Sequence, residues 1–142
     1  MKIETLNTYT SQDLEDLKEL LSSLSDRLEL KEEDLIQVLG NPHTHLYVIY
    51  SEEGRIIGCA TLCVSPTMEG NMGYVEDVVV SPHYRGKQLG KRLMEHLLNE
   101  AKQYAPILLH LTSNPKRIAA NGLYQSLQFQ QKETNVYQME IK

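Results

Sequence analysis

Four cations and two glycines lie together between Arg85 and Arg92, where an apolar segment gives way to a helical pattern. The amino-terminal end of a helix carries a positive partial charge, so acidic side chains usually stabilise it. Here the charged side chains are basic instead, namely Arg85, Lys87, Lys91 and Arg92. A bound anion would remove this conflict, because the free backbone N–H groups of a helix start bind phosphate oxygens. The segment therefore predicts a phosphate site that uses the N–H groups of Gly86, Gln88 and Gly90.

The spacing of this basic turn does not by itself name the ligand. No Ser or Thr follows Gly90-Lys91, so the turn lacks the P-loop motif, and it also lacks the full Gly-x-Gly-x-x-Gly of a dinucleotide-binding fold. A glycine-rich turn ahead of a solvated amphipathic helix is the alternative without a ligand.

Two elements must hold the basic turn in place. The apolar run from Tyr74 to Val80 predicts a strand before it. After it, four apolar residues recur at helical spacing and predict one buried helix face: Leu89, Leu93, Leu97 and Ala101.

The other patterns predict an α/β domain built around a mixed sheet. Thr10 and Asp13 form a capping box ahead of a helix that reaches Leu24, and a second helix covers 31–39. Asn114 as cap and Pro115 at the first helical position predict a helix that continues to residue 127. We expect a hairpin turn at 51–54, a loop at 66–73, and further strands at 2–6, 46–50, 55–64, 107–112, 129–132 and 135–141.

The chain has 142 residues, 41% of them hydrophobic, and a formal net charge of −5. This length is typical of one domain with its own core, so we expect residues 1–142 to form a single domain. The acidic balance argues against nucleic acid as a partner, because such ligands require a broad basic face. No apolar stretch is long enough for a membrane span and no signal core follows Met1, so we expect no membrane partner and a cytoplasmic location.

The cysteines and histidines indicate neither a disulfide nor a metal site. Cys59 and Cys63 lie in one strand-like run, about 13 Å apart when extended, which is too far for a disulfide. Neither this pair nor His43 with His45 has a third ligand nearby. We therefore interpret the cysteines as small core residues.

With the basic turn between a strand and a helix, the chain resembles the GNAT superfamily of N-acetyltransferases over nearly its whole length. The acetyl-coenzyme A signature of that family, Arg/Gln-x-x-Gly-x-Gly/Ala, falls on Arg85, Gly86, Lys87, Gln88, Leu89 and Gly90. A second signature, an alanine-rich helix ending in Tyr-x-x-x-Gly-Phe, falls on 119–124 and on Gln128-Phe129. The chain departs from the family at Gln88 and at Gln128, where glycine is usual.

The resemblance implies a GNAT-like fold, with a mixed, mostly antiparallel and twisted sheet flanked by about four helices. It also implies direct attack of a primary amine on acetyl-coenzyme A (acetyl-CoA) in a ternary complex, without a metal. Residues expected to bind the cosubstrate are Val78, Val80, Arg85, Gly86, Lys87, Gln88, Leu89, Gly90, Lys91, Asn121 and Tyr124.

Two side chains are candidates for the chemistry. Aliphatic amines are mostly protonated at neutral pH, and Glu76 is the leading candidate for the base, while strand alternation places Asp77 on the opposite face. The resemblance places Tyr124 close to the sulfur, where it could protonate the departing thiolate. The alternatives are a structural acid at 76, a partly buried aromatic residue at 124, and a solvent-facing Asn121.

The acceptor, the assembly state and the catalytic competence are less constrained. Nine acids lie between Asp13 and Asp34 and could attract a cationic acceptor, or they could form a solvated helix face. We expect a homodimer, from the family and from the free edge of an alternating carboxy-terminal strand. A catalytically silent acetyl-CoA-binding regulatory module is the alternative function.

Overall fold

The computed structural model describes all residues from Met1 to Lys142. The chain divides into two compact units, Met1–Thr112 and Ser113–Lys142. The strands are β1 (Lys2–Thr5), β2 (Thr44–Tyr50), β3 (Ile56–Thr67), β4 (Gly70–Val80) and β5 (Ile107–His110). The helices are α1 (Ser11–Leu24), α2 (Glu32–Gly40), α3 (Leu89–Ala101) and α4 (Ile118–Ser126), with short 3-10 turns at Pro82–Tyr84 and Lys102–Tyr104.

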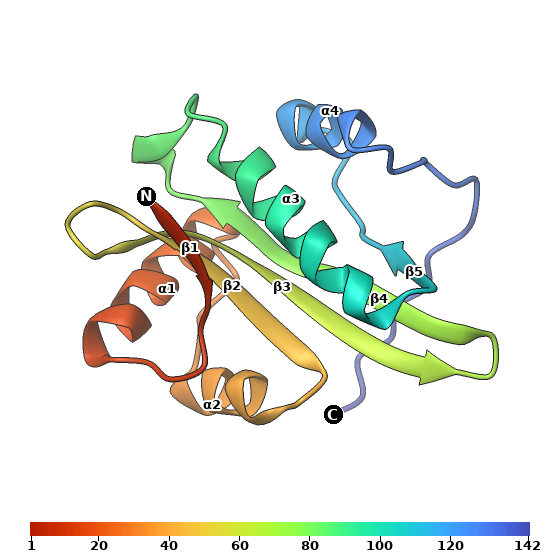
Figure 1. The fold of residues 1–142 in the computed structure, drawn as a ribbon, viewed down its shortest axis with the longest axis horizontal. Helices are drawn as coiled ribbons and strands as arrows, with labels where there is room; N and C mark the ends of the chain where they lie inside the picture. The colour runs from red at the N-terminus through yellow and green to blue at the C-terminus, as the bar shows by residue number, and fades with distance from the viewer. The chain divides into compact units, whose positions relative to one another are not determined.

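The first unit is built on a five-stranded sheet in the order β1-β2-β3-β4-β5 (Figure 1). The first four strands pair antiparallel with their neighbours, and β5 pairs parallel with β4. The predicted mixed, mostly antiparallel sheet with about four helices is confirmed. A parallel neighbour requires a crossover connection, and α3 supplies it between β4 and β5.

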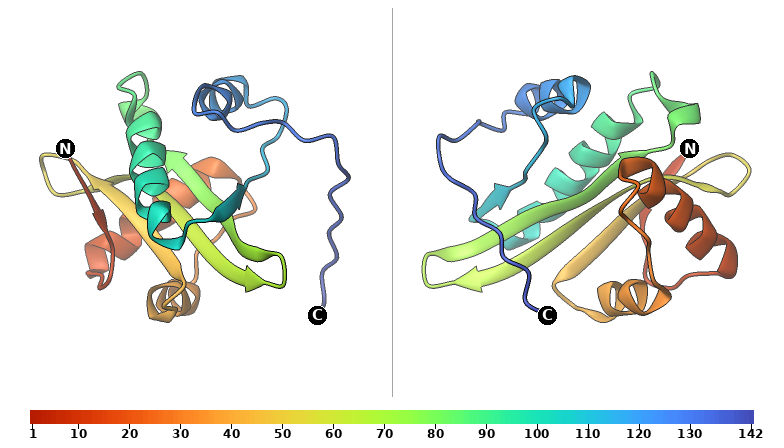
Figure 2. Two further views of the ribbon diagram at one scale, coloured as in Figure 1. Left: turned by 45° about the vertical axis from the view of Figure 1, so that its right-hand side comes forward. Right: turned by 180° about the vertical axis from the view of Figure 1, so that it is seen from behind.

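Helices cover both faces of this sheet. α3 crosses one face, and α1 and α2 lie on the other, as a comparison of Figure 1 with the view from behind in Figure 2 shows. The predicted apolar face of α3 is confirmed, because Leu89, Leu93, Leu97 and Ala101 are all buried. The predicted capping box is also confirmed, since the Thr10 side chain accepts from the Asp13 N–H and the Asp13 carboxylate accepts from the Thr10 N–H.

The predicted loop at 66–73 is wrong, because β3 and β4 continue through it as a long hairpin. Their ladder extends from Val64 opposite Gly73 to Thr67 opposite Gly70. The turn is closed at Gly70, whose φ of 109° lies in the left-handed half of backbone space that glycine tolerates. The glycine, proline and asparagine residues in 66–73 therefore indicate a strand end and a tight turn, not a long loop. The predicted turn at 51–54 is confirmed by the Gly54 N–H donating to the Ser51 carbonyl.

The second unit holds α4 and an extended carboxy-terminal segment. α4 begins at Ile118, later than predicted, because Asn114 caps a turn rather than the helix: its side-chain oxygen accepts from the Lys116 N–H at 2.9 Å. The strands predicted at 129–132 and 135–141 are wrong, since no strand follows Ser126. Alternating apolar residues favour a strand only where a neighbouring strand supplies hydrogen bonds.

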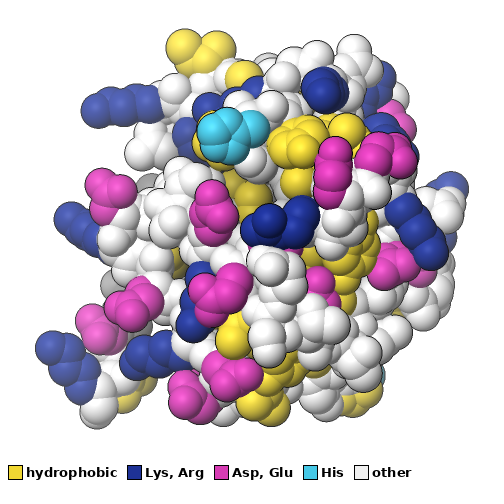
Figure 3. Space-filling model, turned by 90° about the vertical axis from the view of Figure 1, so that its left-hand side faces the viewer, with side chains coloured by type: hydrophobic (Ala, Val, Ile, Leu, Met, Phe, Trp, Pro, Cys, Tyr) yellow, Lys and Arg dark blue, Asp and Glu magenta, His cyan; other side chains and the backbone are white.

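A membrane span would require a long apolar helix, and a nucleic acid would require a broad basic face. No helix combines the length and the apolar character that crossing a membrane requires. On the face of the molecule in Figure 3, acidic and basic side chains are interspersed, and no broad basic area forms there.

Candidate functional site

The basic turn has the geometry of an anion site. Gly86 has a φ of 82° and Gln88, the cap of α3, has a φ of 58°, so the chain reverses through two left-handed residues. Gln88 caps α3 without a side-chain hydrogen bond. The backbone N–H groups from Gly86 to Lys91 donate to no protein acceptor, and a Cβ added at Gly86 would meet only open space. These residues fit the diphosphate of acetyl-CoA, which would accept from the free donors.

Most of the cations around this turn have weak partners or none. Lys87 lies over the ring of Tyr84, at 5.2 Å from its centroid, and Lys91 lies 3.8 Å from Glu95 on the exposed surface. Arg85 makes no ion pair, and the first turn of α3 contains no acid. Exposed pairs of this kind contribute little, so the positive charge stays available to an anion.

The edge of β4 that faces β5 is only partly paired. The parallel ladder runs from Asn71 opposite Ile107 to Tyr74 opposite His110 and stops there. β4 continues to Val80 with no strand on that edge, so Val78 and Val80 lie in the unpaired part. Free backbone groups along such an edge can pair with amides of an extended ligand.

A β-bulge in β4 contradicts the predicted placement of Asp77. Thr61 pairs with Glu76, but Cys59 pairs with Val79, so β4 has one extra residue at this point. Asp77 takes up the bulge with a φ of 55°, and its carboxylate accepts from the Thr61 hydroxyl at 3.2 Å. Cross-strand partners share a face, so Glu76 also lies on the Thr61 side. The two acids therefore lie on one face rather than on opposite faces.

This pair of acids changes the electrostatics of the α1/α2 side of the sheet. Partial burial, together with the negative charge of Asp77, raises the pKa of Glu76 above its ordinary value. Burial also raises the pKa of the Cys63 thiol, and the charges of Glu76 and Asp77 add to the effect. A carboxylate with a raised pKa is a better proton acceptor near neutral pH.

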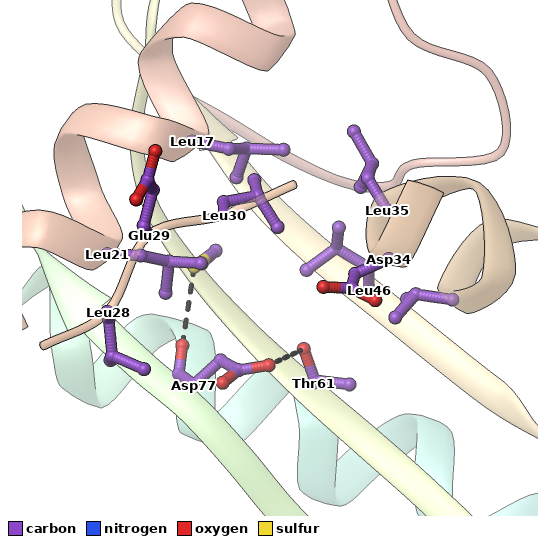
Figure 4. A pocket seen from close by; sticks show the side chains of 12 residues that line it. Leu17, Leu21, Leu28, Glu29, Leu30, Asp34, Leu35, Leu46, Thr61 and Asp77 are labelled. Carbon is purple, nitrogen blue, oxygen red and sulfur yellow. Dashed lines mark hydrogen bonds between the residues drawn. The ribbon is translucent and has the colours of Figure 1, made fainter. Parts of the chain in front are cut away.

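Beside the bulge, a cavity of about 230 Å³ opens between the sheet, α1 and α2 (Figure 4). Asp77 and Thr61 lie at its base, and Asp34 of α2 and Glu29 contribute the other carboxylates. Its walls are mainly apolar: Leu17, Leu21, Leu28, Leu30, Leu35 and Val38. No sequence pattern predicted this cavity, although two adjacent acids inside an apolar strand are a signal that could have indicated the bulge.

In the second unit, Tyr124 is buried on α4 and packs edge-on against Phe129, with ring centroids 6.1 Å apart. Burial raises the pKa of the Tyr124 phenol, and Arg117 opposes the rise. The phenol therefore keeps its proton at neutral pH. Gln128 has the left-handed φ of 73° that the glycine of the motif would favour, which costs about 1 kcal/mol.

Asn121 already has a partner within its own unit. Its side-chain amide donates to the Asn114 carbonyl at 3.0 Å, which ties α4 to the segment before it. The backbone around Gly122 is open, with nothing within 4 Å of an added Cβ. A role of Asn121 in cosubstrate binding therefore stays a prediction, and it would use the side-chain oxygen.

The titratable residues do not assemble a metal centre. No group of three or more His, Cys, Asp or Glu side chains has the arrangement to hold a metal ion. Cys59 and Cys63 are both free thiols, and burial raises the pKa of Cys59.

Known proteins resemble the chain in fold and, over part of its length, in sequence. It is 37% identical over 83 residues to a glucosamine 6-phosphate N-acetyltransferase of Trypanosoma brucei brucei, an alignment that covers 56% of the chain and 54% of the relative. It is 31% identical over 70 residues to an Arabidopsis thaliana protein of the same name, which covers 47% of each. The chain thus spans about half the length of these curated relatives.

Solved structures match along nearly the entire chain. A crystal structure of a Trypanosoma brucei acetyltransferase has a TM-score of 0.75 at 26% identity, covering 99% of this chain and 98% of that one. The Arabidopsis thaliana glucosamine-6-phosphate N-acetyltransferase structure has a TM-score of 0.78 at 21% identity, covering 98% and 99%, which shows the shared fold.

A model of the acetyltransferase (GNAT) family matches residues 9–129, which include the basic turn, the bulge with Glu76 and Asp77, and Tyr124. This chain belongs to the acetyltransferase (GNAT) family.

Proposed function

We propose that residues 1–142 act as one N-acetyltransferase domain, which transfers the acetyl group of acetyl-CoA to a primary amine. The observation that carries this proposal is the row of free backbone N–H groups from Gly86 to Lys91, surrounded by cations without strong partners. It is supported by family membership and by the unpaired edge of β4 next to the turn.

The cosubstrate supplies an activated acetyl group as a thioester. In this proposal the N–H groups of Gly86, Lys87, Gln88, Leu89, Gly90 and Lys91 bind its diphosphate, and Arg85 and Lys87 add positive charge. The backbone of Val78 and Val80 pairs with the amides of its pantetheine arm. Asn121 contributes its side-chain oxygen.

Glu76 is the base of the proposed reaction. An amine acceptor arrives mainly as an ammonium ion, with an ordinary pKa of about 10.4, and must lose a proton before it can attack. Because the pKa of Glu76 is raised, its carboxylate is suited to accept that proton, either directly or through a water molecule. The amine nitrogen then forms the new bond to the acetyl carbon as the bond from that carbon to sulfur breaks.

Tyr124 is the proposed acid. The departing thiolate takes up a proton or a hydrogen bond, because a free thiol has a pKa of about 8.5. A protonated phenol can supply it, and burial keeps the Tyr124 phenol protonated. Its assignment rests on the position of Tyr124 in the family motif.

Calorimetry and a thiol-release assay test the proposed function together. Acetyl-CoA should bind with heat release and with an affinity that falls as salt rises, because the contacts are to phosphates. Incubation with acetyl-CoA and a panel of primary amines should then release one free thiol for each amide formed. Folded protein that shows no heat of binding would refute the function. Binding without thiol release on any amine would instead favour the silent regulatory module.

We further propose that the chain forms a homodimer through its carboxy-terminal segment. Four apolar residues of this segment are between 71% and 88% exposed: Val136, Tyr137, Met139 and Ile141. Side chains of this size are seldom left in water together, and a second copy of the chain would cover them. Light scattering should give twice the chain mass, and replacing Tyr137 and Ile141 by Lys should halve it, while Gln138→Lys should not. A monomeric wild type would exclude this assembly.

The cytoplasmic location stays a prediction.

A further inference from the structure

The side chains that line the cavity beside the bulge do not suit a sugar phosphate, which is the acceptor that the names of the curated relatives indicate. Of the twelve side chains that line it, eight are leucine, valine or cysteine, three are carboxylates and one is Thr61. None is Lys, Arg or His. A phosphate in this cavity would meet negative charge and no cation, and this repulsion would oppose its binding.

The carboxylates of the cavity are free to meet a cation. Glu29, Asp34 and Asp77 take part in no ion pair. Asp77 and Asp34 lie toward the same open space, and the Glu29 carboxylate lies at the other end of the cavity (Figure 4). Asp77 is held by its contact to Thr61, at 3.2 Å from the hydroxyl to the carboxylate. Glu76, the proposed base, directly precedes Asp77 in β4, although it is not among the residues that line the cavity.

The size of the cavity limits the rest of the acceptor. A volume of about 230 Å³ corresponds to roughly eight water molecules of liquid, and so to a ligand on the order of eight non-hydrogen atoms. The walls at Leu28 and Leu30 come from the connection between α1 and α2, and those at Leu35 and Val38 come from α2. Such walls stabilise hydrocarbon and offer no partners to sugar hydroxyls.

We infer that the acceptor is a small primary amine with a hydrocarbon body, whose ammonium group is held by Asp77 and Asp34 and whose body contacts the leucines of α1, α2 and their connection. This inference rests on the proposed function, because it assigns the acceptor of that same site. Asp34 and Leu28 are then residues that determine specificity.

A series of acceptors tests this inference with the wild-type protein. The probes are butylamine, hexylamine, 2-phenylethylamine, glucosamine and glucosamine 6-phosphate, each with acetyl-CoA in the thiol-release assay. We expect kcat/KM to rise about 4-fold for each added methylene until the cavity is full, and to be at least tenfold higher for hexylamine than for glucosamine 6-phosphate. A flat series, or glucosamine 6-phosphate as the best acceptor, would overturn the inference while leaving the acetyltransferase function intact.

Matched variants locate the effect in the cavity. Leu28→Ala should lower kcat/KM for hexylamine several-fold through KM, whereas Ile36→Ala, at a comparably exposed leucine-sized side chain outside the cavity, should not. Asp34→Asn should raise KM for butylamine, hexylamine and 2-phenylethylamine, whereas Asp26→Asn should leave it unchanged. Equal effects within each pair would contradict the placement of the acceptor.

Direct binding separates this inference from the proposed function. Hexylamine titrated into the protein should shift NMR signals of residues in the cavity wall, and glucosamine 6-phosphate should not. If no amine is acetylated but hexylamine binds there, the proposed function is wrong and the cavity assignment stands. If amines are acetylated but hexylamine binds elsewhere, only the cavity assignment fails.

Discussion

The two faces of the sheet in the first unit are packed very differently. Under α3 the core is tight: Leu93, Met94 and Leu97 have 0% exposure, and a Cβ at Gly58 would lie 3.1 Å from Leu93. Under α1 and α2 there is also a core, but it is interrupted by a cavity of about 230 Å³ that contains carboxylates.

The face under α3 contributes mainly to stability, and the face under α1 and α2 holds the base of the proposed chemistry. The face under α3 fixes the helix whose amino-terminal end carries the basic turn. The opposite face has a left-handed residue at Asp77, an added residue in β4, and open space beside both. Strain and voids lower stability, and they are often kept where a ligand must be held.

The largest expected effect concerns Glu76. Replacing it by Gln should lower kcat by about 10²- to 10⁴-fold, the range for loss of a general base, while acetyl-CoA binding is kept. In the wild type, kcat/KM should fall as the pH drops through the raised pKa of Glu76, because protonation removes the base. This acidic limb should be absent in the variant. The exposed Glu69→Gln is the control, and a variant as active as that control would exclude Glu76 as the base.

The next effect concerns the tightly packed face. Leu93→Ala should lower the free energy of unfolding by about 3 kcal/mol, because the space it leaves cannot collapse under α3. Denaturant titration measures this loss. A cost below about 1 kcal/mol would show that this face is more loosely packed than its burial indicates.

A smaller effect is expected at the buried carboxylate of the α1/α2 face. Burial alone would raise the pKa of Asp16, but hydrogen bonds from Arg55, the Ile56 N–H and Gln12, with the charge of Arg55, lower it. Arg55 donates to Asp16 at 2.6 Å, so Arg55→Ala should lower the free energy of unfolding at pH 7, because the buried Asp16 carboxylate loses its charged donor.

The sign of its pH dependence follows from the lowered pKa. An acid with a depressed pKa stabilises the fold above its ordinary pKa, and this contribution is lost as the pH falls through the depressed value. The gap in unfolding free energy between wild type and Arg55→Ala should therefore narrow in acid. A gap that widens as the pH falls would contradict the assigned shift.

The smallest effect is expected at the cavity wall. Leu28 is 42% exposed, so Leu28→Ala should change the free energy of unfolding by no more than about 0.5 kcal/mol. Compared with Leu93→Ala in the same denaturant titration, this tests whether the two faces differ in packing as described. A loss similar to that of Leu93→Ala would remove the contrast.

Local signals predicted much of the first unit. The Thr10 and Asp13 capping box, the Ser51–Gly54 turn and the buried face of α3 each depend on residues a few positions apart, and each is confirmed. The strands at 55–64 and 74–80 were predicted, but their extension through 66–73 was missed, because there β3 and β4 are stabilised by each other rather than by their own composition. The carboxy-terminal strands were predicted from alternation alone, with no neighbour to pair with.

The sequence by itself determined the basic turn: the glycines, the cations and the absence of acids at the start of α3 are all contiguous, and helix electrostatics gives them one meaning. Only the tertiary structure decided which way Asp77 faces and what lies beside it. The physical reason is that one extra residue in β4 changes the face on which a side chain lies. The register of β4 is set by its pairing with β3, where Thr61 lies sixteen residues from Asp77. The cavity in turn depends on where α1 and α2 pack.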